Sequence, residues 1–315
     1  ENAFNHCDKA ISIDFGTGLK EIGATAFSDC KALTSISLPA SLETIGSSAF
    51  SGCAGLTGGL VIPNSVTTIG DSAFANDEKL TEELTIGSSV TSIGKNAFAN
   101  CRFSGTLTIP DSVTSIGEAA FNACQFTDIS LGNRLVEIGK NAFYNSGTYS
   151  GHLSIPDSVT TIGESAFSSL GFASIHLGKS VTTIGASAFI NCTIVHSLDI
   201  ASVPSSITYG TQAFHSMGNP NILYVNSESQ KNEIGDYITS GRSITAITNG
   251  GTFAANAEFK FGELAAPIKD GFIFDGWYDS ESFTGNAVTT APTAGKTYYA
   301  KWIELTAENI SMEYG

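Results

Sequence analysis

The chain has 315 residues, of which 14% are charged, and its 15 basic and 30 acidic side chains give a net charge of −15. A field of this sign repels phosphate groups, so we expect neither nucleic-acid binding nor attachment to anionic lipid. No stretch reaches the roughly 18 consecutive apolar residues that a membrane-spanning helix needs, so we expect no direct membrane insertion.

The dipeptide Ala-Phe recurs at a fixed spacing from the start of the chain. Its Phe residues stand 22 to 25 positions apart, at Phe4, Phe27, Phe50, Phe74, Phe98, Phe121, Phe143, Phe167, Phe189 and Phe214. A period of this length is typical of a solenoid. Because Ala3-Phe4 already matches the end of later units, we expect the sequence to be a piece of a longer protein.

One unit shows the expected local structure. Leu107 and Ile109 alternate with polar residues, so both point to one face of a strand, which Pro110 ends because it has no N–H. A second extended segment leads to the Ile-Gly pair, where Gly117 permits a tight turn, and Phe121 is expected on about one helical turn. A single unit buries too few apolar side chains to offset the entropy of ordering its backbone, so it needs neighbouring coils.

The repeated pattern L-x-x-I-x-L-P-x-S-V-T-x-I-G-x-x-A-F-x-x-C resembles the BspA-type leucine-rich repeats of bacterial surface proteins. The resemblance covers about residues 1–226. It implies a mainly β solenoid, a leucine-rich-repeat horseshoe of nine to ten coils of 22–25 residues, with parallel strands on its concave side.

The repeat fades after Phe214, and we assign residues 1–246 to the solenoid. Residues 222–246, with a strand and a polar helical stretch at 227–237, are expected to form its C-terminal cap. Residues 247–304 contain Gly276-Trp277-Tyr278 and Tyr299-Ala300-Lys301-Trp302. They resemble the Listeria–Bacteroides (internalin B-repeat) module, which implies a small β-grasp-like domain. Residues 305–315 are expected to be a linker or the start of a further domain.

The cysteines share one repeat position, three residues after the Phe. They are Cys7, Cys30, Cys53, Cys101, Cys124 and Cys192, and other coils have Asp77, Ser146, Leu170 or Met217 there. We interpret the set as a buried structural ladder of free thiols. Disulfides between neighbours such as Cys7 and Cys30 are the alternative, but parallel Cβ vectors make their dihedral unfavourable. A zinc site is less favoured still, because no C-x₂₋₄-C spacing occurs.

Nothing in the sequence indicates catalysis or a cofactor. The five histidines fall at different repeat positions, and neither H-E-x-x-H nor G-x-S-x-G occurs. The recurring Gly appears once per coil and not as G-x-G-x-x-G, so no phosphate loop is predicted. We therefore predict a protein that is not an enzyme and has no cofactor or metal.

The outward residues of the strands form the remaining candidate site. Most are small and polar, and the aromatic and Arg anchors of tight protein interfaces are nearly missing. The least uniform part is the predicted contact face, which comprises Asp128, Ser130, His152, Ser154, Ser174, His176, Ser197 and Asp199. A solvated strand face without a ligand is the alternative interpretation of the same residues.

These observations predict a monomeric, non-enzymatic binding module at the surface of a bacterium or secreted from it. The predicted module is adhesin-like, and its predicted partner is a host matrix protein, mucin or glycan. Two alternatives stay open: a structural stalk or spacer that displays another domain of a larger surface protein, and an accessory domain of an enzyme encoded in the same gene.

Overall fold

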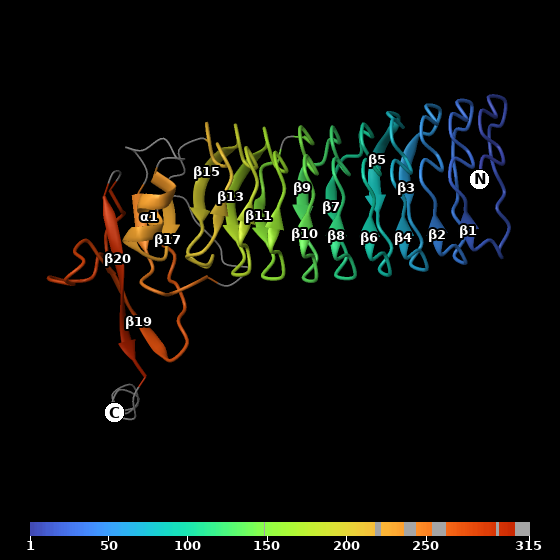
Figure 1. The fold of residues 1–315 in the computed structure, drawn as a ribbon. Helices are drawn as coiled ribbons and strands as arrows, with labels where there is room; N and C mark the ends of the chain where they lie inside the picture. The colour runs from blue at the N-terminus through green and yellow to red at the C-terminus, as the bar shows by residue number, and fades with distance from the viewer. Residues whose placement is uncertain (148, 218–221, 236–243, 254–262, 294–295, 306–315) are drawn as a thin grey trace.

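The computed structural model describes residues 1–147, 149–217, 222–235, 244–253, 263–293 and 296–305. Coils stack side by side from the N-terminus onward, and Figure 1 shows them following a nearly straight line. The predicted solenoid with parallel strands is confirmed. The curved horseshoe outline that the resemblance implied is not seen in this view.

A nine-stranded parallel sheet runs along one side of the stack, and each coil adds two residues to it. The strands are β1 (Glu21–Ile22), β2 (Thr44–Ile45), β4 (Thr68–Ile69), β6 (Ser92–Ile93), β8 (Ser115–Ile116), β10 (Glu137–Ile138), β12 (Thr161–Ile162), β14 (Thr183–Ile184) and β16 (Thr208–Tyr209). Neighbours pair in register, so that Ile22 faces Ile45 and Ile116 faces Ile138. The Ile of every Ile-Gly pair is therefore a buried strand residue.

The Leu-x-Ile segments form a second set of strands on another side of the coils. These are β3 (Gly58–Val61), β5 (Leu80–Thr85), β7 (Thr106–Thr108), β9 (Asp128–Ser130), β11 (His152–Ile155), β13 (Gly171–Leu177) and β15 (Thr193–Asp199). They occur as two pairs, β3–β5 and β7–β9, followed by a continuous sheet from β11 onward. The matching segment around Ile36 and Leu38 is not a strand, and both side chains are only partly buried.

The repeated Phe side chains form a continuous stack through the core. Neighbouring rings lie nearly parallel with centroids 5.2 to 5.6 Å apart. The helical turn predicted around each Phe is wrong, because left-handed residues stand two positions before and after it, such as Ala119 and Ala123 around Phe121. The Phe121 N–H donates to the Ala142 carbonyl of the next coil, at 2.8 Å, and not to its own turn. Hydrogen bonds between coils thus determine this backbone.

The Gly of each Ile-Gly pair was predicted to permit a tight turn, but the structure gives a different reason for it. Gly117 does not have a positive φ, but a Cβ there would lie 2.7 Å from the carbonyl carbon of Gly94 and from the backbone nitrogen of Lys95. A side chain would therefore separate neighbouring coils. Close approach of the coils, and not turn geometry, requires glycine here.

The sheet that begins with β11 continues past the repeats. β17 (Ile222–Val225) pairs with β15 and β18 (Ile244–Ile247), β18 pairs in parallel with β20 (Thr297–Glu304), and β20 pairs antiparallel with β19 (Phe272–Tyr278). The predicted helix is present as α1 (Glu228–Gly235). Within the described ranges, no helix is long and apolar enough to cross a membrane. These strands do not by themselves establish the expected β-grasp fold.

Strand β17 lies between two hydrophobic cores. Leu223 and Val225 belong to the core of the coils. Ile222 and Tyr224 point to the opposite face, where they join a second core with Phe253 and other residues of the C-terminal part. The outward face of the sheet is therefore covered at its C-terminal end and open to solvent only farther along the array.

Candidate functional site

The structure divides the predicted contact face into two halves. Asp128, Ser130, His152 and Ser154 are exposed or half-buried. Ser174, His176, Ser197 and Asp199 are buried, although they stand at equivalent positions of the following strands. The second half lies toward β17, where the second core covers the same face of the sheet. These four side chains are not accessible to a macromolecular partner.

A buried histidine–carboxyl pair occupies the covered half. His176 Nδ1 lies 2.6 Å from Asp199 Oδ2, and the two side chains are 6% and 0% exposed. The other oxygen of Asp199 accepts a hydrogen bond from the Ala201 N–H at 2.9 Å. Each oxygen of the Asp199 carboxyl group therefore has a hydrogen-bond partner, which offsets part of the cost of burying it. The pair connects β13 to β15 inside the protein.

Two more histidines lie next to this pair. His152 Nδ1 is 2.5 Å from Ser174 Oγ, and the His152 and His196 rings have centroids 6.2 Å apart. In the sequence, His196 stands at a different repeat position from His152 and His176. Strand β15 has one extra residue opposite the stretch from Phe172 to Ser174, and this irregularity displaces His196 along the strand. The one sign of this irregularity in the sequence is the spacing of 25 residues between Phe189 and Phe214, the longest in the array.

In the part of the chain that the structure describes, the histidines belong to no metal-binding group. Within the described residues, no three His, Cys, Asp or Glu side chains converge as metal ligands. Ser154 and His176 occupy paired positions on β11 and β13, and the Nδ1 of His176 is used by Asp199. The exposed members of this group offer hydrogen-bonding atoms to a ligand.

The cysteines form a column that runs through the coils. All six are free thiols, and all except the half-buried Cys7 are buried. Each buried thiol donates to the carbonyl of the repeat Phe of the preceding coil, 25 to 27 residues earlier, as in Cys124 Sγ to Phe98 O at 3.3 Å. Ser146 makes the same contact to Phe121 O at 2.5 Å. Burial also raises the pKa of Cys192 to about 12, so its reactive thiolate is suppressed.

Asp77 interrupts this column with a carboxyl group. It is fully buried, and neither of its oxygens has a well-formed hydrogen bond with the described residues. Burial raises the pKa of this carboxyl well above its ordinary value, and the backbone of Cys53 offsets only part of the effect. A neutral acid retains an O–H donor, which is the role the thiols have in the other coils.

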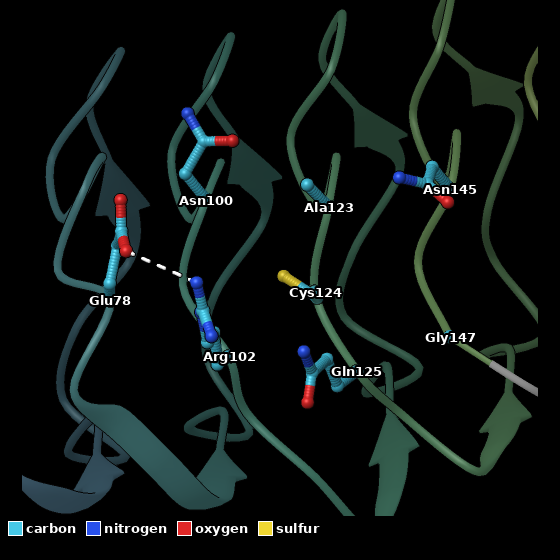
Figure 2. A pocket seen from close by; sticks show the side chains of 8 residues that line it. All are labelled: Glu78, Asn100, Arg102, Ala123, Cys124, Gln125, Asn145 and Gly147. Carbon is cyan, nitrogen blue, oxygen red and sulfur yellow. Dashed lines mark hydrogen bonds and ion pairs between the residues drawn. The ribbon is translucent and has the colours of Figure 1, made fainter.

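A polar groove lies on the turn side of the coils (Figure 2), and the sequence did not reveal it. Its volume is about 580 Å³, and its lining comprises Glu78, Asn100, Arg102, Ala123, Cys124, Gln125, Asn145 and Gly147. Arg102 Nη2 lies 3.3 Å from Glu78 Oε2, which pairs the two charges of the lining. The groove therefore presents amide groups and one ion pair, with no net charge.

The groove exists because two repeat positions have small residues. Asn76, Asn100 and Asn145 stand two residues after the repeat Phe, and Asn100 donates to Asn76 at 2.8 Å, but the intervening coil has Ala123. Glu78, Arg102 and Gln125 each stand four residues after the repeat Phe, and the next coil has the small residue Gly147 at that position. The interruption of an Asn ladder by Ala123 was the signal in the sequence that could have located this site.

Comparison with known proteins identifies the repeats. The BspA-type leucine-rich repeat region matches in six copies, over residues 1–104, 91–151 and 147–259. No protein with a curated description matches the sequence.

Three crystal structures are similar to parts of the chain. A leucine-rich repeat protein from Bacteroides ovatus is 22% identical, with a TM-score of 0.47 and 71% of each chain covered. The pneumococcal vaccine antigen PcpA is 18% identical, with a TM-score of 0.28 and coverage of 74% of this chain and 88% of that one. A leucine-rich cell surface protein from Faecalibacterium prausnitzii is 19% identical, with a TM-score of 0.29 and coverage of 71% and 80%. Since the family match spans most of the sequence, the chain belongs to the BspA-type leucine-rich-repeat family.

Proposed function

We propose that the chain is a non-enzymatic binding module of a bacterial surface or secreted protein, which recognises an extracellular protein or glycan. The observation that carries this proposal is a strip of exposed polar side chains on successive parallel strands. Thr85, Thr106, Thr108, Ser130 and His152 all face solvent along it. Because each strand packs its inward side chains into the common core of the coils, the strip is ordered before a ligand binds, which lowers the entropic cost of binding.

Membership of the BspA-type family supports a location outside the cell. The net charge of −15 supports solubility and disfavours a polyanionic partner. The accessible contact region of this proposal is the N-terminal half of the predicted face, with Asp128, Ser130, His152 and Ser154, because the other half is buried.

We also propose that residues 247–304 are an internalin B-repeat-like module, with residues 222–246 as the cap of the array. The antiparallel pair β19–β20 and the buried Trp277 support this assignment. In this role the module covers the open end of the last coils, since repeat arrays need terminal elements that remove exposed apolar edges.

The test is binding of the whole chain to immobilised matrix proteins and mucins. We expect saturable binding that His152→Ala weakens. His215→Ala is the matched control, because His215 is also an exposed histidine but lies in the turn after the repeat Phe214. Equal effects of the two substitutions would exclude the strand face as the contact region, and the absence of binding to these targets and to glycans would reject the binding proposal.

A stalk or spacer is the second function to consider. Two observations favour it: the coils stack in a nearly straight line (Figure 1), and the sequence repeats small polar residues in one coil after another. A spacer needs length and solubility but no specific contact surface. The spacer function predicts that the fully folded chain shows no saturable binding to the matrix proteins and mucins.

A further inference from the structure

The amides of the groove are free to bind a ligand. Asn100 uses its amide nitrogen on Asn76, which leaves its oxygen toward the groove. Within the described residues the side-chain amides of Gln125 and Asn145 make no hydrogen bond, and both are exposed. An amide offers donors and an acceptor at one site, as a hydroxyl group does. Such a lining suits a ligand that presents many hydroxyl groups.

The charge and apolar content of the groove exclude other ligand classes. Glu78 and Arg102 neutralise each other, so neither phosphate nor a cation finds an unpaired charge. Among the described residues that line the groove none is aromatic, and Ala123 and Cys124 are its small side chains. Protein interfaces depend on buried aromatic or Arg anchors in apolar pockets, which this groove does not provide.

The spacing of the coils indicates the form of the ligand. Paired neighbouring strands repeat about every 4.8 Å, so equivalent side chains such as those of Arg102 and Gln125 follow each other at about that interval. This is close to the length of one sugar ring in an extended β-linked chain. An extended peptide presents equivalent groups about every 6.6 Å, on every second residue, and would fall out of step with the coils.

We propose that the groove formed by Asn100, Arg102, Ala123, Gln125 and Asn145 binds an extended neutral glycan, with about one sugar per coil. The proposal rests on the proposed binding function and adds to it a ligand class and a site away from the strand face. The sugar rings lie over Ala123, where the missing Asn side chain leaves room, and their hydroxyls bond to the amides on either side.

The test uses the whole chain and three hexasaccharides: the neutral cellohexaose and mannohexaose, and a charged alginate hexasaccharide. Isothermal titration calorimetry is expected to show binding of at least one neutral hexasaccharide. The decisive variant is Ala123→Asn, which restores the Asn ladder and fills the groove. Asn tolerates the φ of 58° at this position and occurs there in neighbouring coils, so the fold is preserved.

Ala123→Asn is expected to weaken binding at least about tenfold, which corresponds to the loss of one good hydrogen bond. Gln125→Ala, which removes an exposed amide without adding bulk, is expected to weaken it as well. Ser169→Asn is the matched control, because Ser169 has the same repeat position and a φ of 65° but lies outside the groove lining, two coils from Ala123. Its affinity is expected to equal that of the parent chain.

Several results would overturn the proposal. Binding that survives Ala123→Asn and Gln125→Ala would place the glycan elsewhere, and preference for alginate would contradict a neutral ligand. If no hexasaccharide binds while the chain still binds a matrix protein, the glycan groove is rejected and the binding function stands. If neither glycan nor matrix protein nor mucin binds, both proposals fail.

Discussion

The ring of Trp277 lies 6.3 Å from the ring of Tyr224, which connects the C-terminal part of the chain directly to a strand of the repeat sheet. Tyr224 is fully buried, and its hydroxyl accepts a hydrogen bond from the Ala265 N–H at 2.8 Å. The boundary predicted after residue 246 falls within β18, Ile244–Ile247, which pairs with strands on both sides. We infer that the two parts unfold together.

Tyr224→Ala is expected to lower the free energy of unfolding by about 3–5 kcal/mol, because it removes a large buried aromatic ring from the second core. Urea denaturation followed by circular dichroism would measure the change. Tyr144→Ala is the control, since Tyr144 is 41% exposed and its loss should change stability by less than about 0.5 kcal/mol. Two separate transitions in the parent chain would show that the array and the C-terminal part are independent.

Asp77→Asn is expected to stabilise the protein at neutral pH. Because burial raises the folded-state pKa of Asp77, the folded protein holds a proton that the unfolded chain releases above about pH 4. The stability associated with this proton is fully present below the unfolded-state pKa and is lost as pH rises toward the folded-state pKa. Asn is neutral at every pH and still donates a hydrogen bond, so the variant avoids this loss.

The measurement is the free energy of unfolding from pH 3.5 to pH 8 for the parent chain, Asp77→Asn and Asp77→Cys. Asp77→Cys restores the residue of the neighbouring coils and serves as a second neutral replacement. Both variants should gain stability over the parent as pH rises, and the difference should vanish near pH 3.5. A difference that stays constant across this range would show that Asp77 does not titrate between the two states.

His176→Ala and His152→Ala are expected to differ although both residues were predicted on one contact face. Removing His176 leaves the buried Asp199 carboxylate without its partner, which costs about 3–5 kcal/mol of stability. Removing the exposed His152 costs about 1 kcal/mol, the value of its single hydrogen bond to Ser174.

Denaturant titration of these variants separates a structural role from a contact role. In the double variant His176→Ala/Asp199→Ala the loss should be smaller than the sum of the single losses, because the unpaired charge is absent. A His176→Ala protein as stable as the parent would contradict the burial of the pair.

Thiol labelling is expected to distinguish Cys7 from the other five cysteines. Cys7 is half-buried at the first coil, whereas the others are buried and bonded to carbonyl oxygens, so iodoacetamide should modify Cys7 first. Mass spectrometry of the folded protein over time would give the order. All six should react after unfolding in guanidinium, and early modification of Cys124 in the folded chain would indicate that the column opens.

Much of the fold follows from the sequence. The spacing of Phe27, Phe50 and Phe74 gave the solenoid, because a unit of this length can bury its apolar side chains only against copies of itself. Alternation around Leu107 and Ile109 gave a strand and its inward face, since side chains alternate with a period of two. The shared position of the cysteines placed them in one column.

The tertiary structure decided which of these repeated positions are accessible. Ser130 and Asp199 are equivalent in the sequence, yet one is exposed and the other fully buried, because the C-terminal part packs against the sheet only at its end. The groove at Ala123 likewise depends on side chains from successive coils. Periodicity describes one coil and its neighbours, whereas exposure depends on contacts between residues far apart in the chain, which no local pattern encodes.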